Sequence, residues 1–144
     1  MVKRFEVIII GAGAAGMLCA IEAGKRGKKV LIIDHSKKIG EKIRISGGGR
    51  CNFTNINTNP SKFISSNPNF CISALKQYTQ NDFINLVKKY DIKFHEKKLG
   101  QLFCDNSSQQ IIDMLLEECK SANVILKNET SVSSVTKIEN EYFI

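Results

Sequence analysis

Residues 5–34 constrain the fold of this chain more than any other stretch. They open with four consecutive β-branched residues, 7–10, which is typical of a strand buried on both faces of a parallel sheet. Gly11, Gly13 and Gly16 follow directly in the spacing G-x-G-x-x-G. The first glycine permits a tight turn, the second lets a pyrophosphate approach the backbone, and the third lets the next helix pack closely on the sheet. The pattern therefore predicts a strand, a turn and a helix that together bind a phosphorylated ligand.

The residues after the glycines complete this unit. Good helix formers run from Ala14 to about Lys25, and an apolar strand is predicted at 29–33. Asp34 ends that strand. In dinucleotide-binding folds, a carboxylate at this position hydrogen-bonds the ribose and repels the extra phosphate of NADP. The pattern favours FAD or NAD and does not separate the two. His35 could touch the adenine, although a histidine at a strand end is more often an exposed loop residue. The predicted contacts are Gly11, Ala12, Gly13, Ala14, Ala15, Gly16, Asp34 and His35.

A second glycine-rich segment, SGGGRCNFTN, spans residues 46–55. Three consecutive glycines disfavour helix and strand, so we expect a loop that folds close to a ligand and offers it several amides. Arg50 adds a planar cation, and basic residues precede the segment. Such a second loop is expected for FAD, which carries two phosphates and a long ring, and is superfluous for NAD. The candidate binding residues here are Lys42, Ser46, Gly47, Gly48, Gly49, Arg50, Cys51 and Asn52.

The middle of the chain predicts short elements outside the parallel sheet. Turn-forming residues make 57–69 a loop, and apolar residues at helical spacing predict amphipathic helices at 70–77 and 82–90. Residues 91–94 and 101–104 are expected to form a hairpin that branches off the main sheet.

The last third of the chain is expected to return to the parallel sheet. Ser107 and Gln110 have the spacing of a capping box for a helix that ends near Ser121. A strand at 124–126 then completes the strand order 3-2-1 of a mononucleotide-binding half, and a hairpin occupies residues 130–144. The predicted buried stripe of the helix is Ile111, Ile112, Leu115, Leu116 and Cys119. The fold class is α/β, a Rossmann-like doubly wound parallel sheet with a small antiparallel hairpin or meander.

The fingerprint at residues 11–16 and the motif ISGGGRCNFTN together resemble the BaiN/RdsA-type, or YhiN-like, flavoprotein family, and the similarity continues through GQLFCDNSSQQIIDMLLEEC. Its fold is similar to that of glutathione reductase and other flavoproteins with two dinucleotide-binding domains. Cys104 departs from the family pattern, because a proline is expected after Phe103. Family members run far beyond residue 144, so we expect residues 1–144 to be an incomplete N-terminal FAD-binding domain without the substrate domain and the C-terminal flavin-binding segment.

The resemblance implies FAD, with its pyrophosphate at residues 11–16, its ribose at Asp34 and its flavin end toward residues 46–52. It also implies NAD(P)H as electron donor and a reductive reaction, because members are linked to dihydrouridine formation in ribosomal RNA and to reduction of bile-acid intermediates. We expect Cys51 to neighbour the flavin; the alternative is that Arg50 lowers the pKa of its thiol and permits direct chemistry. No catalytic residue can be named.

Other functions stay open at this point. An NAD-dependent dehydrogenase could use the same fingerprint, and a basic Rossmann unit could serve only as a nucleotide-binding or RNA-binding module. The substrate is either a small molecule or ribosomal RNA.

Composition narrows the class of protein. The 144 residues carry a net charge of +7, which attracts anions, but no arginine-rich tract marks a nucleic-acid site. The five cysteines lack C-x-x-C spacing, so neither a disulfide framework nor a metal site is expected. No apolar run is long enough to span a bilayer and no signal-peptide cleavage site is visible, so we expect a cytoplasmic protein without a membrane partner. No obligate protein partner is inferred.

Overall fold

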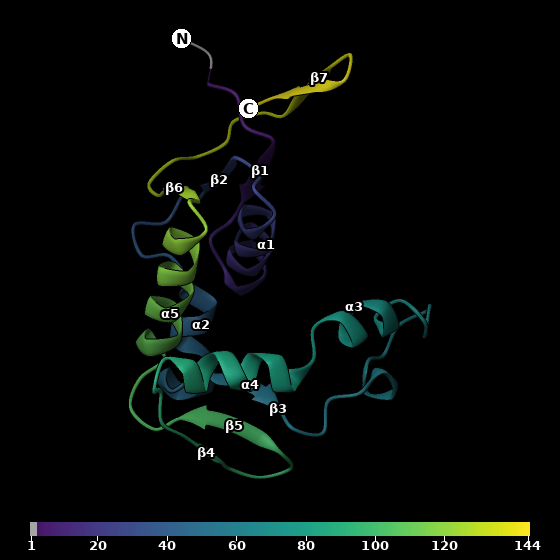
Figure 1. The fold of residues 1–144 in the computed structure, drawn as a ribbon, viewed down its shortest axis with the longest axis vertical. Coiled ribbons are helices and arrows are strands. Elements are labelled where there is room, and N and C mark those ends of the chain that lie inside the picture. The colour runs from purple at the N-terminus through teal and green to yellow at the C-terminus, as the bar shows by residue number, and fades with distance from the viewer. Residues whose placement is uncertain (1–2) are drawn as a thin grey trace. The chain divides into compact units, whose positions relative to one another are not determined.

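A computed structural model describes residues 3–144 of the chain (Figure 1). The residues divide into two compact units. The first unit combines the N-terminal part, up to Lys42, with Leu115–Ile144, and the second unit is Ile43–Met114. Each unit has its own sheet.

A parallel sheet organises the first unit. Its strands are β1 (Val7–Ile10), β2 (Val30–Ile33) and β6 (Ile125–Lys127), in the order β1-β2-β6. All four residues of the central strand β2 are buried. The β-branched run 7–10, predicted to be buried on both faces, is not: residues 7–9 of β1 are half-buried and Ile10 is exposed, because β1 is an edge strand of the sheet in the described residues. The predicted order 3-2-1 is therefore confirmed, with the third strand one residue later than expected.

Helix α1 (Ala14–Lys25) connects the first two strands, at the bounds predicted from the sequence. Met17, Ala20 and Ile21 form its buried face. The helix runs close to the preceding turn, because a Cβ placed at Gly16 would lie 2.0 Å from the carbonyl oxygen of Gly11. Gly16 is thus required for packing.

Helix α5 (Gln109–Ser121) carries the chain back toward β6, and its residues from Leu115 onward belong to the first unit. The Cys119 thiol lies 3.8 Å from the carbonyl oxygen of Met17 in α1. Burial, with Glu118 beside it, raises the pKa of Cys119 to about 11. The predicted stripe is buried except for Leu116, which is half-buried, and Met114 joins it.

An antiparallel sheet organises the second unit. Its strands are β3 (Asn52–Asn55), β5 (Gln101–Cys104) and β4 (Phe94–Glu96), in the order β3-β5-β4. Helix α4 (Gln80–Lys89) contributes Phe83 to an aromatic cluster, in which the Phe53 ring lies 6.0 Å from Phe83 and 5.4 Å from Phe94. The predicted hairpin exists, but its first strand begins only at Phe94.

Shorter elements complete the chain. They are α2 (Glu41–Ile45), the 3-10 turns η1 (Ser46–Gly49) and η2 (Pro60–Lys62), α3 (Ile72–Gln77), and the hairpin of β7 (Thr136–Ile138) and β8 (Glu141–Phe143). The three glycines of the second glycine segment have left-handed, non-helical backbone, in keeping with the predicted loop, but residues 52–55 form β3. No helix within residues 3–144 is long and apolar enough to cross a membrane.

The predicted capping box of α5 is wrong. Ser107 Oγ accepts from the amide of Gln109 at 3.1 Å, but the side-chain oxygen of Gln110 is buried without a hydrogen-bond partner among the described residues. A complete capping box occurs instead at α4, between Thr79 and Asp82. The spacing alone cannot distinguish the two sites, because tertiary contacts decide which residue begins the helix.

Gly24 in α1 provides a test of the first unit. Gly24→Ala should lower the free energy of unfolding by about 1–3 kcal/mol, because the added Cβ would lie 2.4 Å from the carbonyl oxygen of Ala122. Chemical denaturation of the protein measures this loss. Cys19→Ala, at an exposed position of the same helix, is the control and should change stability little. Equal stability of the two variants would contradict the close packing at Gly24.

Candidate cofactor-binding site

The turn between β1 and α1 leaves a helix N-terminus open to an anion. Gly11 has a φ of +104°, which glycine adopts without strain, and its amide donates to the carbonyl oxygen of Ile33 at 2.7 Å. Gly13 is the N-cap of α1, and within residues 3–144 no side chain hydrogen-bonds to this helix end. Gly13, Ala14 and Ala15 are exposed. The first amides of α1 and its dipole are therefore available to a phosphate.

The glycines of this turn have different surroundings. Apart from its chain neighbours, no atom of residues 3–144 lies within 4 Å of a Cβ placed at Gly13, whereas Gly16 has no such room. The open space lies where a pyrophosphate would approach the backbone. The residues present fit a dinucleotide at this helix end.

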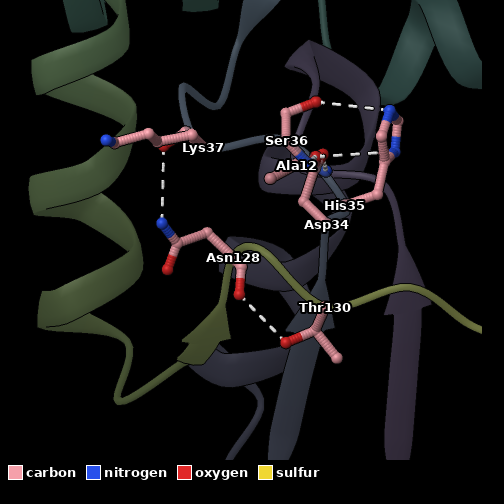
Figure 2. Close-up of polar contacts among 7 residues, drawn as sticks. All are labelled: Ala12, Asp34, His35, Ser36, Lys37, Asn128 and Thr130. Atoms are coloured by element: carbon pink, nitrogen blue, oxygen red, sulfur yellow. Dashed lines mark hydrogen bonds and ion pairs between the residues drawn. The ribbon is translucent and has the colours of Figure 1, made fainter.

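Asp34 connects the end of β2 to this turn. Its carboxylate accepts from the amide of Ala12 at 2.6 Å and from the amide of Ser36 at 2.7 Å (Figure 2). Burial alone would raise the pKa of Asp34, but the amides of Ser36 and Ala12 outweigh it, so the pKa is lowered. Each carboxylate oxygen has a second lone pair, so a ribose hydroxyl can still donate to it.

Three supporting residues were not identified from the sequence: Ser36, Asn128 and Thr130. The amide of Thr130 donates to the carbonyl oxygen of Asp34 at 2.9 Å. Figure 2 shows the Asn128 side chain donating to the carbonyl oxygen of Lys37 at 3.4 Å, and the Thr130 hydroxyl donating to the carbonyl oxygen of Asn128 at 2.9 Å. Asn128 and Thr130 follow β6, the strand next to β2. The rule that ligand sites form at the carboxyl ends of neighbouring parallel strands could have indicated them.

The remaining candidates in this unit are surface residues. The side chain of His35 is 81% exposed, with its Nε2 3.4 Å from Ser36 Oγ. Lys42 is exposed on α2. Both can reach a ligand, and neither is held in one orientation by a buried contact. Their role in cofactor binding stays a prediction.

Asp34→Asn should lower the free energy of unfolding at pH 7 by about 1–3 kcal/mol, because an amide cannot accept from both backbone donors. A lowered pKa stabilises the fold above the unfolded-state value of about 3.9, and that contribution is lost as pH falls through the folded-state value. The difference between wild type and variant should therefore shrink below about pH 4. Denaturation across pH measures this, with exposed Asp91→Asn as control. A pH-independent difference would contradict it.

The second glycine segment forms a run of left-handed backbone. Gly47, Gly48 and Gly49 have φ values of +58°, +66° and +84°, and Cys51 follows at +52°. A Cβ at Gly47 would lie 2.6 Å from the Phe103 ring, so this glycine is needed both for its φ and for packing. A non-glycine residue is strained in this backbone region. Contacts with the surrounding structure must therefore hold Cys51 in this conformation.

Long-range contacts hold this run in place. Ser108 donates its amide to the carbonyl oxygen of Gly49 and its hydroxyl to that of Arg44, each at 2.8 Å. The amide of Cys104 donates to the carbonyl oxygen of Arg50 at 3.0 Å. Ser108 and Phe103, which fix the segment, were not identified from the sequence, because contacts between distant segments leave no local pattern.

Cys51 is a buried thiol, with 4% of the residue exposed. Burial raises its pKa, and a hydrogen bond with the Ser46 side chain opposes this only in part. The alternative of a thiol with a lowered pKa is therefore wrong, because burial has the largest effect on Cys51 and raises its pKa. Arg50 is exposed, and its guanidinium has no hydrogen-bond or ion-pair partner within residues 3–144.

The structure thus groups the candidates into two clusters. One joins residues 11–16 to Asp34 in the first unit, and the other comprises Ser46–Asn52 in the second unit. In the part of the chain that the structure describes, no three His, Cys, Asp or Glu side chains gather as metal ligands.

Gly47→Ala and Gly48→Ala form a matched pair. Both would place a side chain at a left-handed φ, but the space around Gly48 is open whereas Gly47 faces Phe103. Gly47→Ala should therefore cost about 1–3 kcal/mol more in free energy of unfolding than Gly48→Ala. Denaturation of the two variants under one condition measures the difference. Equal losses would show that Phe103 does not pack against this turn.

Comparison with known proteins assigns the family. Residues 5–144 match the family model of the HI0933-like protein Rossmann domain. The chain belongs to this family. The resemblance inferred from the two glycine motifs is thereby confirmed.

Two curated relatives of this HI0933-like chain are enzymes by name. Ribosomal RNA dihydrouridine synthase of Escherichia coli (strain K12) is 56% identical over 140 residues, which are 97% of this chain and 35% of the relative. A 3-dehydro-bile acid delta(4,6)-reductase of Clostridium scindens is 39% identical over 111 residues, 76% of this chain and 27% of the relative. The chain therefore spans about a third or less of the length of these relatives.

Solved structures agree on the fold. A flavocytochrome c3 fumarate reductase matches with a TM-score of 0.58 at 18% identity, over 94% of this chain and 28% of that chain. The HI0933-like chain has the Rossmann-like FAD-binding fold with small antiparallel sheets, as predicted.

Proposed function

We propose that this HI0933-like chain is the FAD-binding part of a flavin-dependent oxidoreductase that reduces a carbon–carbon double bond conjugated with a carbonyl group. The observation that carries the proposal is the exposed N-terminus of α1, with open space at Gly13 and a carboxylate held beside it by the amide of Ala12. That arrangement suits the pyrophosphate and ribose of a dinucleotide.

We propose that different residues bind different parts of FAD. The amides of residues 13–16 would hold the pyrophosphate, Asp34 would accept from the adenosine ribose, and Ser46–Asn52 would lie toward the flavin. The exposed cation Lys42 would add charge complementarity to the phosphates, and Arg50 would bring a planar cation toward the flavin. When bound, the flavin supplies hydride transfer, and we propose NADH or NADPH as the source of its electrons.

Ribosomal RNA is the substrate that we propose. The relative named as a ribosomal RNA dihydrouridine synthase is the more similar of the two, in identity and in coverage. Uracil and a 3-oxo steroid with conjugated double bonds share one chemistry, addition of hydrogen to an alkene polarised by a carbonyl. The net charge of +7 also favours a polyanion over an acidic steroid, because polyanion binding releases counterions.

The competing functions predict different outcomes. An NAD-dependent dehydrogenase would have no flavin absorbance, and a non-catalytic RNA-binding module would bind RNA without reducing it. A bile-acid reductase would contain flavin but act on the steroid only.

Expression of the complete protein and of its Gly13→Val variant tests the proposal. The wild type should be yellow, should be bleached anaerobically by NADH or NADPH, and should form dihydrouridine in unmodified ribosomal RNA, as detected by mass spectrometry. Gly13→Val should lose FAD, because its side chain would fill the space left for the pyrophosphate. A colourless wild type, or Gly13→Val with its full flavin content, would reject the cofactor assignment. Flavin reduction without dihydrouridine would reject the substrate.

A further inference from the structure

His95 and Asp105 form a close pair on the antiparallel sheet of the second unit. The Nδ1 atom of His95 in β4 lies 2.7 Å from Oδ1 of Asp105, which directly follows β5. The amide of Asp105 donates to the carbonyl oxygen of Lys93 at 3.0 Å, which fixes the aspartate beside the hairpin. The sequence shows no partner for His95, because ten residues and a turn separate it from Asp105.

This pair lies on the same face of the sheet as the second glycine segment. His95 is directly opposite Phe103 in the strand register, and their rings stack with centroids 6.4 Å apart at 20°. The edge of the Phe103 ring in turn meets the backbone of Gly47. Phe94, one residue before His95, points to the other face and packs on Phe53. A continuous contact thus leads from Gly47 through Phe103 to His95.

We infer that His95 donates the proton of the proposed reduction and that Asp105 positions its imidazole. The inference rests on the proposed function, which puts the flavin at Ser46–Asn52. When bound, the reduced flavin would supply hydride, with two electrons, to one carbon of the conjugated double bond and would be left oxidised. The carbonyl stabilises the resulting carbanion as an enolate, whose carbon takes the proton from Nε2 of His95. The product has two new C–H bonds, and solvent returns a proton to the imidazole.

The geometry of the pair suits this role. A carboxylate that accepts from Nδ1–H leaves Nε2 pointing away from Asp105, so the imidazolium presents Nε2–H to a substrate. The side chain of His95 is 45% exposed, so substrate and solvent protons can reach it. Lys97 brings a positive charge to the same ring, with its Nζ 5.0 Å from the centre of the Phe103 ring on which His95 stacks. Lys97 adds positive charge near a developing enolate.

Three variants of the complete flavoprotein separate proton donation from cofactor binding. His95→Gln keeps a polar side chain but cannot act as an acid. In Asp105→Asn, the amide can donate to Nδ1 and stabilise the opposite tautomer. Glu96→Gln is the matched control, since Glu96 is an exposed neighbour in β4 without a side-chain partner within residues 3–144. For each protein we would measure FAD content, reduction of the flavin by NADPH, and anaerobic re-oxidation of the reduced flavin by in vitro-transcribed ribosomal RNA.

The inference requires a selective effect. His95→Gln should slow re-oxidation by RNA roughly 10²- to 10⁴-fold, the usual contribution of a general acid, with FAD content and reduction by NADPH unchanged. Asp105→Asn should slow the same step, and Glu96→Gln should not. Wild-type re-oxidation in His95→Gln, or an equal loss of FAD content, would overturn the inference.

A spectroscopic measurement tests the pair without turnover. The ¹⁵N shifts of the neutral His95 ring should show the Nδ1–H tautomer in the wild type and its loss in Asp105→Asn. An Nε2–H tautomer in the wild type would overturn the inference whatever the kinetics. Failure of the proposed function is distinguishable, because then the wild-type protein itself would bind no FAD or its reduced flavin would not react with RNA.

Discussion

The hydrogen bonds that Asp34 accepts from the amides of Ala12 and Ser36 are the interaction on which the candidate site depends. They tie the end of β2 to the turn after β1, which brings a carboxylate and a helix N-terminus together at one edge of the sheet. Without these bonds the carboxylate of Asp34 and the N-terminus of α1 would have no fixed distance, because the first follows β2 and the second follows the turn after β1. A half-buried carboxylate is costly unless it is hydrogen-bonded, so the turn and Asp34 stabilise each other. Thr130 extends this network to the chain after β6.

In the second unit, three consecutive glycines have to be held in one conformation. Glycine reaches the left-handed region without strain but loses the most conformational entropy on folding. Ser108 and Phe103 supply the contacts that offset this loss, one through two backbone carbonyls and the other through a ring against Gly47. The conformation of the motif is therefore a property of the whole unit.

Burial decides the chemical character of two cysteines in this unit. Cys51 and Cys104 are both buried, and burial raises the pKa of each thiol, for Cys104 to about 11. Such thiols are protonated at neutral pH and are weak nucleophiles. The imidazole of His95 is, by contrast, accessible, and Asp105 holds its Nδ1 at 2.7 Å. The buried thiols are therefore less suited to proton transfer than this exposed imidazole, to which we assign it in our proposal.

The sequence by itself determined the elements whose signals are local. The β-branched run, the three spaced glycines and the helix formers after them predicted β1, the turn and α1 at the observed bounds, and Asp34 was found by its place at the end of β2. The two glycine motifs also identified the family. Tertiary structure alone decided that Ser107 does not form the expected capping box, that residues 52–55 are a strand, and that the Cys51 thiol has a raised pKa. It also decided that His95 meets Asp105, and that Ser108 holds the glycine turn. These outcomes depend on burial and on contacts between distant residues, which a local pattern of residue types does not encode.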